Sequence, residues 1–435
     1  MLDPGAVRIV ERLRAEGYQA LLAGGCVRDW LMGRPPHDWD VATDADPAAV
    51  ARLFPRTYAV GERFGVTVVL LGGGRYEVAR FRSDGPYPDG RHPATVDPAD
   101  PRADAARRDF TINGMFLDPG TGEVIDHVGG RDDLQRRLIR TIGDPEQRFA
   151  EDHLRLLRAV RFAARLGFGL EPGTKAAIRA GAEAIASVSP ERVGRELTLI
   201  LTEGGASTGL QLLLETGLLG QVLPEVAAMV DVPQPPEHHP EGELWRHVQL
   251  VFEHLSRPGP RLAWAALLHD VGKPRTLTVT DRIRFHNHDQ VGAVMAEGIC
   301  RRLRMANQDT QRIRDLVAQH MRLRHVREMR PGKLKRLLRE PWFPELLELH
   351  RADCLASHGQ LDLYDFCCRQ LADAGVQGLR PVRLLTGDDL IALGWEAGPK
   401  LGRALEALED EQLEGRISTR EEAERFVDRF RRPVP

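Results

Sequence analysis

The feature that most constrains the fold of this chain is a change in the spacing of its hydrophobic residues near Pro145. Up to about residue 142, short apolar runs such as YQALLAGG, DVAT, GVTVVLL and RYEVARFR stand between amphipathic segments. Beyond this point apolar residues recur every three or four positions, as in EDHLRLLRAVRFAARLGF, which indicates helices. We therefore predict an α+β fold, with a mixed β-sheet and its helices first and an all-α remainder.

Breaks in composition divide the helical part further. The stretch 232–243, VPQPPEHHPEGE, has the composition of a linker, and LRPVRLLTGDD opens a last helical module. Within the first part, GVTVVLL and RYEVARFR predict a hairpin across three glycines, whereas 83–102 lacks a hydrophobic period and predicts a mobile loop. We expect four parts: a head at 1–142, a helical neck and body at 143–230, a helical domain at 231–360 and a helical tail at 361–435.

The composition excludes several classes of protein. The chain has no run of about eighteen apolar residues, so we expect no membrane span, and its N-terminus lacks the features of a secretory signal. The five cysteines form no CxxC pair, which fits free thiols in a reducing compartment and predicts a cytoplasmic protein. The net charge of −3 argues against a uniformly basic surface but allows a local basic groove for nucleic acid.

Residues 24–40, GGCVRDWLMGRPPHDWD, begin with a pattern that suits a triphosphate. Gly24 and Gly25 allow the backbone to approach phosphate groups, and Arg28 with the start of the following helix adds positive potential. A pair of glycines alone more often serves an ordinary turn. The conjunction with the acidic residues that follow favours a nucleotide site.

The same stretch ends in two aspartates that suit a metal. Asp38 and Asp40 point to the same side if they lie on a strand, and Mg²⁺ prefers one or two carboxylates with substrate phosphates completing its shell. Glu77, on a later strand, is a candidate third carboxylate. An isolated DxD is common without a metal, so the interpretation depends on the neighbouring motifs.

Further motifs follow in order: RRDFTIN (107–113), EDHLR (151–155) and SPERVGREL (189–197). Together with GGCVRD and HDWD they resemble the class II tRNA nucleotidyltransferases and bacterial poly(A) polymerases of the polymerase-β superfamily. The resemblance implies a polymerase-β-like nucleotidyltransferase head that adds nucleotides to the tRNA 3′ end without a template. It implies Mg²⁺ as cofactor and tRNA, CTP and ATP as partners, for either a monomer or a homodimer.

The resemblance also implies roles for individual residues. Asp38 and Asp40 would hold two Mg²⁺ ions, one at the primer 3′-hydroxyl and one at the triphosphate. The residues that would contact the nucleotide are Gly25 and Arg28 at the triphosphate, Arg108 and Asp109 at the phosphate and ribose, and Asp152, Arg155, Arg158 and Arg161 at the base.

The base-reading residues share a spacing of three, which would place them on one face of a helix. An aspartate beside an arginine presents acceptors and donors together and can imitate the edge of a base, with a selectivity of about 1–3 kcal/mol. The same spacing is also typical of exposed ion pairs on ordinary helices. The preceding motifs favour nucleotide recognition.

The helical half carries a second set of ligand-type residues. His247 in WRHVQL precedes the adjacent His269 and Asp270 in WAALLHDVGK, and imidazoles with a carboxylate suit a divalent metal. A His-Asp pair inside an apolar helix needs a partner because burying it alone is costly. Three further candidates follow along the chain: His288, His320 and Asp353.

This set resembles the HD phosphohydrolases, whose ligands are a distant His, the HD pair and a later Asp. The resemblance implies a second divalent metal (Mg, Mn, Ni or Fe), with His288 and His320 as extra ligands and Lys273 near phosphate. A subset of tRNA nucleotidyltransferases carries an HD region associated with hydrolysis of phosphate monoesters and cyclic 2′,3′-phosphates. A bound metal with only a structural role is an open alternative. His238 and His239 of the linker could reach this site, but two histidines in a proline-rich loop are more often exposed.

The tail segment GWEAGPKLG (394–402) predicts two helices joined by a glycine-rich turn, with Lys400 available to an RNA backbone; a purely structural hairpin is the alternative.

Close relatives differ in product. CC-adding relatives lack a full flexible loop, which the segment from Phe81 to RRDF supplies, and the poly(A) polymerases usually lack an HD segment. CCA addition is the leading prediction, and A addition stays open. A third hypothesis is an HD phosphohydrolase whose head has lost its activity. The presence of Asp38, Asp40 and Arg108 argues against it.

Overall fold

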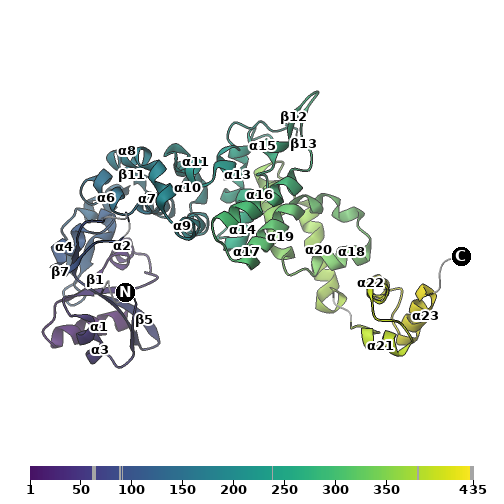
Figure 1. Cartoon of the computed structure of the whole chain (residues 1–435), viewed down its shortest axis with the longest axis horizontal. Helices are drawn as coiled ribbons and strands as arrows, with labels where there is room; N and C mark the ends of the chain where they lie inside the picture. Colours follow the sequence, from purple (N-terminus) through teal and green to yellow (C-terminus); the bar gives the residue numbers. More distant parts are fainter. Residues whose placement is uncertain (61–64, 88–89, 91, 238, 380–381, 432–435) are drawn as a thin grey trace. The chain divides into compact units, whose positions relative to one another are not determined.

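The computed structural model describes residues 1–60, 65–87, 90, 92–237, 239–379 and 382–431. The chain forms two compact units, Met1–Ala227 and Ala228–Pro435 (Figure 1). The first holds a mixed β-sheet with helices, and the second is mainly helical. The predicted α+β fold is confirmed. Among the described residues, no helix is both long enough and apolar enough to cross a membrane.

A seven-stranded sheet organises the first unit, in the order β3-β4-β5-β2-β1-β8-β9. Only β2 and β5 run parallel, and their register places Asp40 opposite Glu77. The predicted β4–β5 hairpin is present, whereas the short β3 was not predicted. The strands are Ala20–Ala23 (β1), Asp40–Thr43 (β2), Thr57–Ala59 (β3), Val66–Leu71 (β4), Gly74–Arg80 (β5), Met115–Leu117 (β8) and Val124–Asp126 (β9).

The two faces of this sheet bury alternate strand residues, as the period of two requires. Leu22 and Val41 lie in the core on the face covered by helices α1, α2 and α3, and Leu21 and Ala42 lie in the core on the opposite face with Phe116. Figure 1 shows α1 and α3 beside the strands. The helices of this part are Pro4–Ala15 (α1), Gly25–Leu31 (α2), Pro47–Leu53 (α3), Pro101–Ala106 (α4) and Gly130–Arg136 (α5).

The stretch 83–102, predicted as a loop without structure, contributes to regular elements instead. β6 (Arg82–Asp84) pairs antiparallel with β7 (Val96–Pro98), and α4 begins at Pro101. These strands are polar and are joined by antiparallel backbone pairing, with an Arg82–Asp84 ion pair within β6, so they leave no hydrophobic period in the sequence. Residues 88, 89 and 91 of the predicted loop lie outside the described residues.

The neck helices complete the first unit. α7 packs against α9 and α10, and the two-stranded parallel sheet β10–β11 joins Leu138–Ile139 to Gly169–Leu170. Asp152 lies between α6 and α7 in extended backbone, and its carboxylate accepts the Leu154 N–H. The predicted single helical face through residue 152 is therefore wrong, because this local bond competes with helical pairing. The helices are Pro145–Glu151 (α6), Arg155–Leu166 (α7), Pro172–Ala180 (α8), Pro190–Thr202 (α9), Ala206–Glu215 (α10), Leu218–Val222 (α11) and Pro224–Ala227 (α12).

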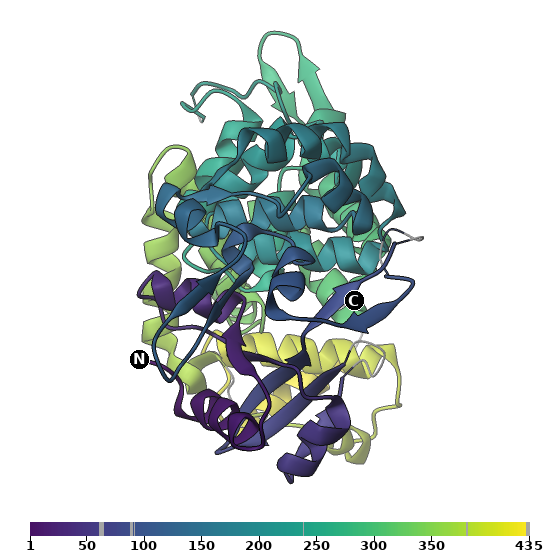
Figure 2. The ribbon, with the colours of Figure 1, turned by 90° about the vertical axis from the view of Figure 1, so that its left-hand side faces the viewer.

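The second unit consists of a helical block and a tail. A hairpin of β12 (Leu277–Val279) and β13 (Ile283–Phe285), which was not predicted, projects from the block (Figures 1 and 2). The tail helices have a small core of their own around Leu390 and Leu408. The helices are Leu244–Glu253 (α13), Pro260–Leu268 (α14), Lys273–Thr276 (α15), His288–Arg302 (α16), Asn307–Gln319 (α17), Pro331–Leu338 (α18), Phe343–Ala356 (α19), Asp362–Leu379 (α20), Gly387–Ala392 (α21), Pro399–Leu413 (α22) and Arg420–Arg431 (α23).

The stretch 232–243 is not a free linker. Gln234 is buried, the Glu241 side chain is only 4% exposed, and Pro233 forms a bridge with Glu243. Polar side chains in this segment bond to residues of the helical block, so its composition resembles that of a linker although it packs as part of the domain.

Candidate active site and metal centre

The first unit contains a pocket of about 700 Å³, within the range of small-molecule sites. Strands β2 and β5, the start of α2 and helices α7 and α9 contribute to its wall. All residues assigned to the nucleotide site from sequence line this one pocket: Gly24, Gly25, Arg28, Asp38, Asp40, Glu77, Arg108, Asp109, Asp152, Arg155, Arg158 and Arg161.

The carboxylates in this pocket occupy different settings. Asp40 opens β2, and burial together with the neighbouring Glu77 raises its pKa to about 6. Asp38 precedes the strand, is 80% exposed and contacts His37 at 3.1 Å, so the argument from strand alternation does not apply to it. Glu77 accepts a hydrogen bond from Arg75. Because their mutual repulsion opposes ionisation of Asp40, these carboxylates fit a divalent cation.

Two arginines border the glycine turn. Gly24 has φ of +78°, and a Cβ there would lie 2.9 Å from Arg108 Nη1, so the turn needs glycine. Arg28 is 3% exposed and donates to Asp29 Oδ1 and to Asn113 Oδ1 at 2.8 and 2.6 Å. The guanidinium of Arg28 is thus held in a fixed position at the pocket wall.

RRDFTIN and the preceding helix α4 form a network of ion pairs with buried carboxylates. Asp104 is 1% exposed and accepts from both Arg107 and Arg108. Burial would raise the pKa of Asp109, but Arg158, which donates to it at 2.6 Å, lowers this pKa to about 2. Asp109 is therefore charged and links the head to α7.

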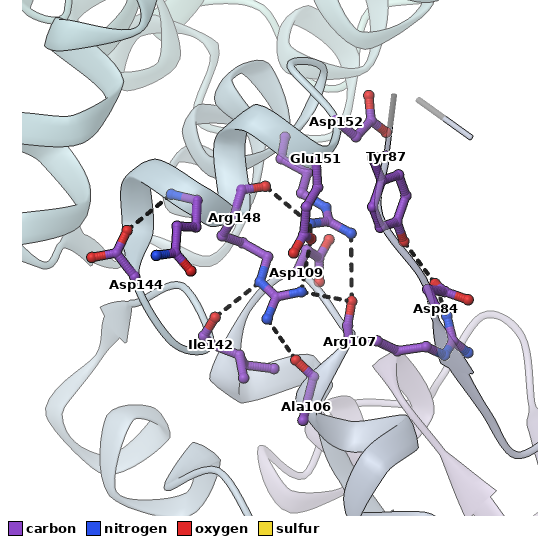
Figure 3. Close-up of polar contacts among 12 residues, drawn as sticks. Asp84, Tyr87, Ala106, Arg107, Asp109, Ile142, Asp144, Arg148, Glu151 and Asp152 are labelled. Atoms are coloured by element: carbon purple, nitrogen blue, oxygen red, sulfur yellow. Dashed lines mark hydrogen bonds and ion pairs between the residues drawn. The ribbon is translucent and has the colours of Figure 1, made fainter. Parts of the chain in front are cut away.

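Figure 3 shows the junction of α6 and α7. Arg155 donates to Glu151 and to the backbone oxygen of Arg148, and Arg148 in turn donates to the backbone of Ala106 and Ile142. The ion pair between Asp152 and Arg155 that helical spacing offered as the alternative to base recognition does not form. The Asp152 carboxylate pairs instead with Arg192 of α9, because it lies outside the helix that carries Arg155.

Several pocket residues were not identified from sequence. The Phe162 ring has the guanidinium groups of Arg28, Arg158 and Arg161 at 5.4, 5.4 and 4.6 Å from its centroid, an arrangement of cation–π contacts. Arg192 also lines the pocket. Arg192 belongs to SPERVGREL, which marked its region, whereas nothing in the sequence distinguished Phe162 from a core aromatic.

The second unit brings the HD residues together in its helical block. His269 and Asp270 follow directly after α14, and His247 comes from α13. His247 Nε2 lies 3.1 Å from Asp353 Oδ1, and Asp270 Oδ1 lies 3.3 Å from His288 Nε2. The HD residues form two groups whose ligand atoms lie within 4.8 Å: His247, His269 and Asp353, and Asp270, His288 and His320. A third group with the same spacing, His239, Glu241 and His247, adjoins them through His247.

The donor set fits a divalent metal. The Nε2 atoms of His247 and His269 are buried and lie 3.1 and 3.2 Å from carboxylate oxygens of Asp353 and Asp270, but neither makes a hydrogen bond within the described residues. Nitrogens and carboxylates that converge in this way fit a metal position between them. Burial would lower the pKa of His247, but Asp353 and Glu241 raise it to about 9. Burial lowers the pKa of His320 to about 4 and keeps that ring neutral, which a metal ligand requires.

A pocket of about 480 Å³ opens beside these groups and includes Asp270, His288 and His320 in its lining. Lys273 lines it too and pairs with Asp270 at 2.7 Å. His239, for which exposure was the favoured alternative, is half-buried and hydrogen-bonds to Glu241; His238 lies outside the described residues.

The tail contains the predicted pair of helices, α21 and α22, on either side of GWEAG. Lys400 is exposed on the first turn of α22 and contacts the backbone oxygen of Arg431 at 3.4 Å. Its predicted role in RNA contact stays a prediction.

The head and the helical block match known domain families. Residues 20–140 match the Poly A polymerase head domain, residues 167–230 the probable RNA and SrmB-binding site of polymerase A, and residues 244–357 the HD domain. The mixed sheet of the head and these domain matches thus define a nucleotidyltransferase joined to an HD domain.

Comparison with individual proteins narrows the class of protein further. The chain is 45% identical to the CCA-adding enzyme of Geobacillus stearothermophilus over 49% of this chain and 53% of that one, so this match spans about half of the relative. It is 34% identical to the A-adding tRNA nucleotidyltransferase of Deinococcus radiodurans over 96% of both chains. The structure of the Bacillus stearothermophilus CCA-adding enzyme in complex with CTP is similar over 99% of this chain and 98% of that one, with a TM-score of 0.76 and 28% identity. This chain belongs to the family of tRNA nucleotidyltransferases and poly(A) polymerases.

Proposed function

We propose that the protein adds CCA to the 3′ end of tRNA, using CTP, ATP and Mg²⁺. The observation that carries the proposal is that every nucleotide-site residue expected from sequence lines one pocket. The fold likeness to a CCA-adding enzyme solved with CTP supports the same assignment. The free cysteines fit a cytoplasmic location.

The pocket residues have distinct tasks in this proposal. Asp38, Asp40 and Glu77 would hold Mg²⁺, which activates the primer hydroxyl and stabilises the leaving pyrophosphate. Arg28 and Arg108 would bind the triphosphate, since guanidinium groups bind phosphate in a bidentate manner.

The base would be read at the α6–α7 junction. Asp152 offers acceptors and Arg155 offers donors at the pocket wall, and each now bonds to a protein partner, Arg192 and Glu151. Side chains rather than a template would select the incoming nucleotide. They can do so because a cytosine and an adenine present different patterns of donors and acceptors.

The product can be tested with three tRNA transcripts, ending before CCA, at CC, and at CCA. We expect CTP incorporation on the shortest transcript, ATP incorporation on the CC transcript, and no extension of the complete one. ATP incorporation on CC without CTP incorporation on the shortest transcript would establish A addition, the second candidate, which the full-length match to an A-adding enzyme favours. Extension of the complete transcript into a long A tail would indicate poly(A) synthesis.

We also propose that the HD site hydrolyses phosphate monoesters or cyclic 2′,3′-phosphates. The buried histidine and aspartate groups beside a pocket that contains Lys273 support it. Combined Asp38→Ala and Asp40→Ala replacement should abolish nucleotide addition and leave hydrolysis of 2′,3′-cyclic AMP intact, and His269→Ala should do the reverse. Loss of both activities in either variant would contradict this partition, and absence of hydrolysis in the wild type would leave the metal with a structural role.

A further inference from the structure

The four histidines of the HD site share one orientation. Each directs Nε2 toward the metal-ligand groups and uses Nδ1 for a bond in the opposite direction. For three of them the Nδ1 partner is the backbone oxygen three residues earlier: His269 to Ala266, His288 to Phe285 and His320 to Val317, at 2.9, 2.9 and 2.7 Å. The backbone itself therefore determines these three tautomers.

His247 is the exception. Its Nδ1 lies 2.8 Å from Oε1 of Glu241, a side chain only 4% exposed. The same oxygen is 2.8 Å from Nδ1 of His239, so one carboxylate binds two imidazoles. The contact comes from the stretch 232–243, whose composition resembled that of a linker.

The chemistry of a metal-bound imidazole makes this contact consequential. A histidine that ligates through Nε2 must carry its proton on Nδ1, and a partner at Nδ1 determines both the tautomer and the direction of the ring. His247 Nε2 is buried and makes no hydrogen bond within the described part of the chain, although Asp353 Oδ1 lies 3.1 Å away. Without an acceptor at Nδ1, the proton could move to Nε2 and the ring could turn.

We propose that Glu241 is the positioning residue of the HD metal site, which orients His247 and makes its Nε2 available to the metal. The inference rests on the proposed metal site and adds to it a carboxylate that does not itself touch the metal. Glu241 does for His247 what the backbone carbonyls do for the other three histidines.

The test measures binding of Mn²⁺ alone to the full-length protein, from the electron paramagnetic resonance signal of free Mn²⁺. All variants carry Asp38→Asn and Asp40→Asn, so that the head does not contribute. We expect Glu241→Ala to weaken binding by about 10–100-fold, the usual effect of losing such a partner. Glu241→Gln, which keeps an acceptor oxygen, should restore part of the affinity. Glu237→Gln, at an exposed carboxylate of the same segment, should bind as the parent does.

A second readout separates orientation from folding. In metal-free protein at a pH above 9, where the His247 ring is neutral, ¹⁵N spectra of the histidine rings should show His247 with Nδ1 protonated in the parent and with both tautomers in Glu241→Ala, while the signals of His269 stay unchanged. Mn²⁺ affinity and a His247 tautomer equal to those of the parent in Glu241→Ala would overturn the positioning role. Loss of all four histidine signals in both Glu241 variants would also overturn it, in favour of a role in folding. If the parent itself bound no Mn²⁺, the metal site would fail and this inference with it.

Discussion

The carboxylate of Asp152 accepts two hydrogen bonds from the Arg192 guanidinium, at 3.1 and 2.8 Å. Asp152 lies between two helices and Arg192 on a third, so the pair connects α9 to the pocket wall. The carboxylate that we propose reads the base is thus held by a residue from a different part of the neck.

Replacing Arg192 with Ala should release this carboxylate and reduce discrimination between bases. We expect the ratio of kcat/KM for CTP over UTP to fall by roughly 5–150-fold, which corresponds to about 1–3 kcal/mol. Arg195→Ala, at an exposed position of the same helix, is the control and should keep the ratio. An unchanged ratio in Arg192→Ala would mean that Asp152 keeps its orientation by other contacts or does not read the base.

Asp40 should make stability depend on pH in the absence of metal. Burial and Glu77 raise the pKa of Asp40 from 3.8 to about 6, so the folded state favours the protonated form. Its stabilising contribution is present below pH 3.8 and is lost as the pH rises through 6. Asp40→Asn, which imitates the protonated form, should therefore melt at a higher temperature than the wild type at pH 8 without Mg²⁺.

This difference in melting temperature should shrink as the pH falls from 7 toward 4, and it should shrink at pH 8 when Mg²⁺ is added to the wild type. The shift corresponds to at most about 3 kcal/mol at pH 8. Asp38→Asn is the control, since its exposed carboxylate should change the melting temperature little. A wild type that is more stable than Asp40→Asn in metal-free buffer at pH 8 would contradict the prediction.

Asp104 should be essential for the stability of the head. Its buried carboxylate neutralises both Arg107 and Arg108, and removal of one member of a buried ion pair typically costs about 3–5 kcal/mol. We expect Asp104→Asn to lower the melting temperature of the head and to raise KM for nucleotides, because Arg108 loses its anchor. Asp97→Asn, an exposed neighbour in β7, should behave as the wild type. Wild-type stability and KM in Asp104→Asn would show that solvent compensates the two arginines.

Gly272 should tolerate no side chain. A Cβ there would lie 2.2 Å from the backbone oxygen of His288 and 2.7 Å from the backbone nitrogen of Gly292, so Gly272→Ala should push α16 away. We expect a loss of about 1–3 kcal/mol and weaker binding of Mn²⁺, since His288 moves with the helix. Gly298→Ala lies on the same helix with open space around it and should stabilise by about 1 kcal/mol. Equal melting temperatures for the two variants would contradict this packing.

Much of the nucleotide site was predictable because its motifs are local. Gly24, Arg28 and Asp40 lie within one short stretch whose residue types suit phosphate and metal, and the change of period near Pro145 separates the sheet from the helices. The hydrophobic pattern of β2 and β5 indicated two strands but not their parallel register. That register, which places Asp40 opposite Glu77, depends on the sheet order.

The sequence alone determined which residue types are present for the chemistry: carboxylates for a metal, arginines for phosphate, and histidines with an HD pair. Only the tertiary structure decided their partners, so that Asp152 pairs with Arg192 rather than Arg155, and Glu241 packs against His247 rather than lying in a linker. The physical reason is that an ion pair or hydrogen bond depends on distance in space. Helical spacing predicts neighbours only while the helix continues, and the helix is interrupted at Asp152.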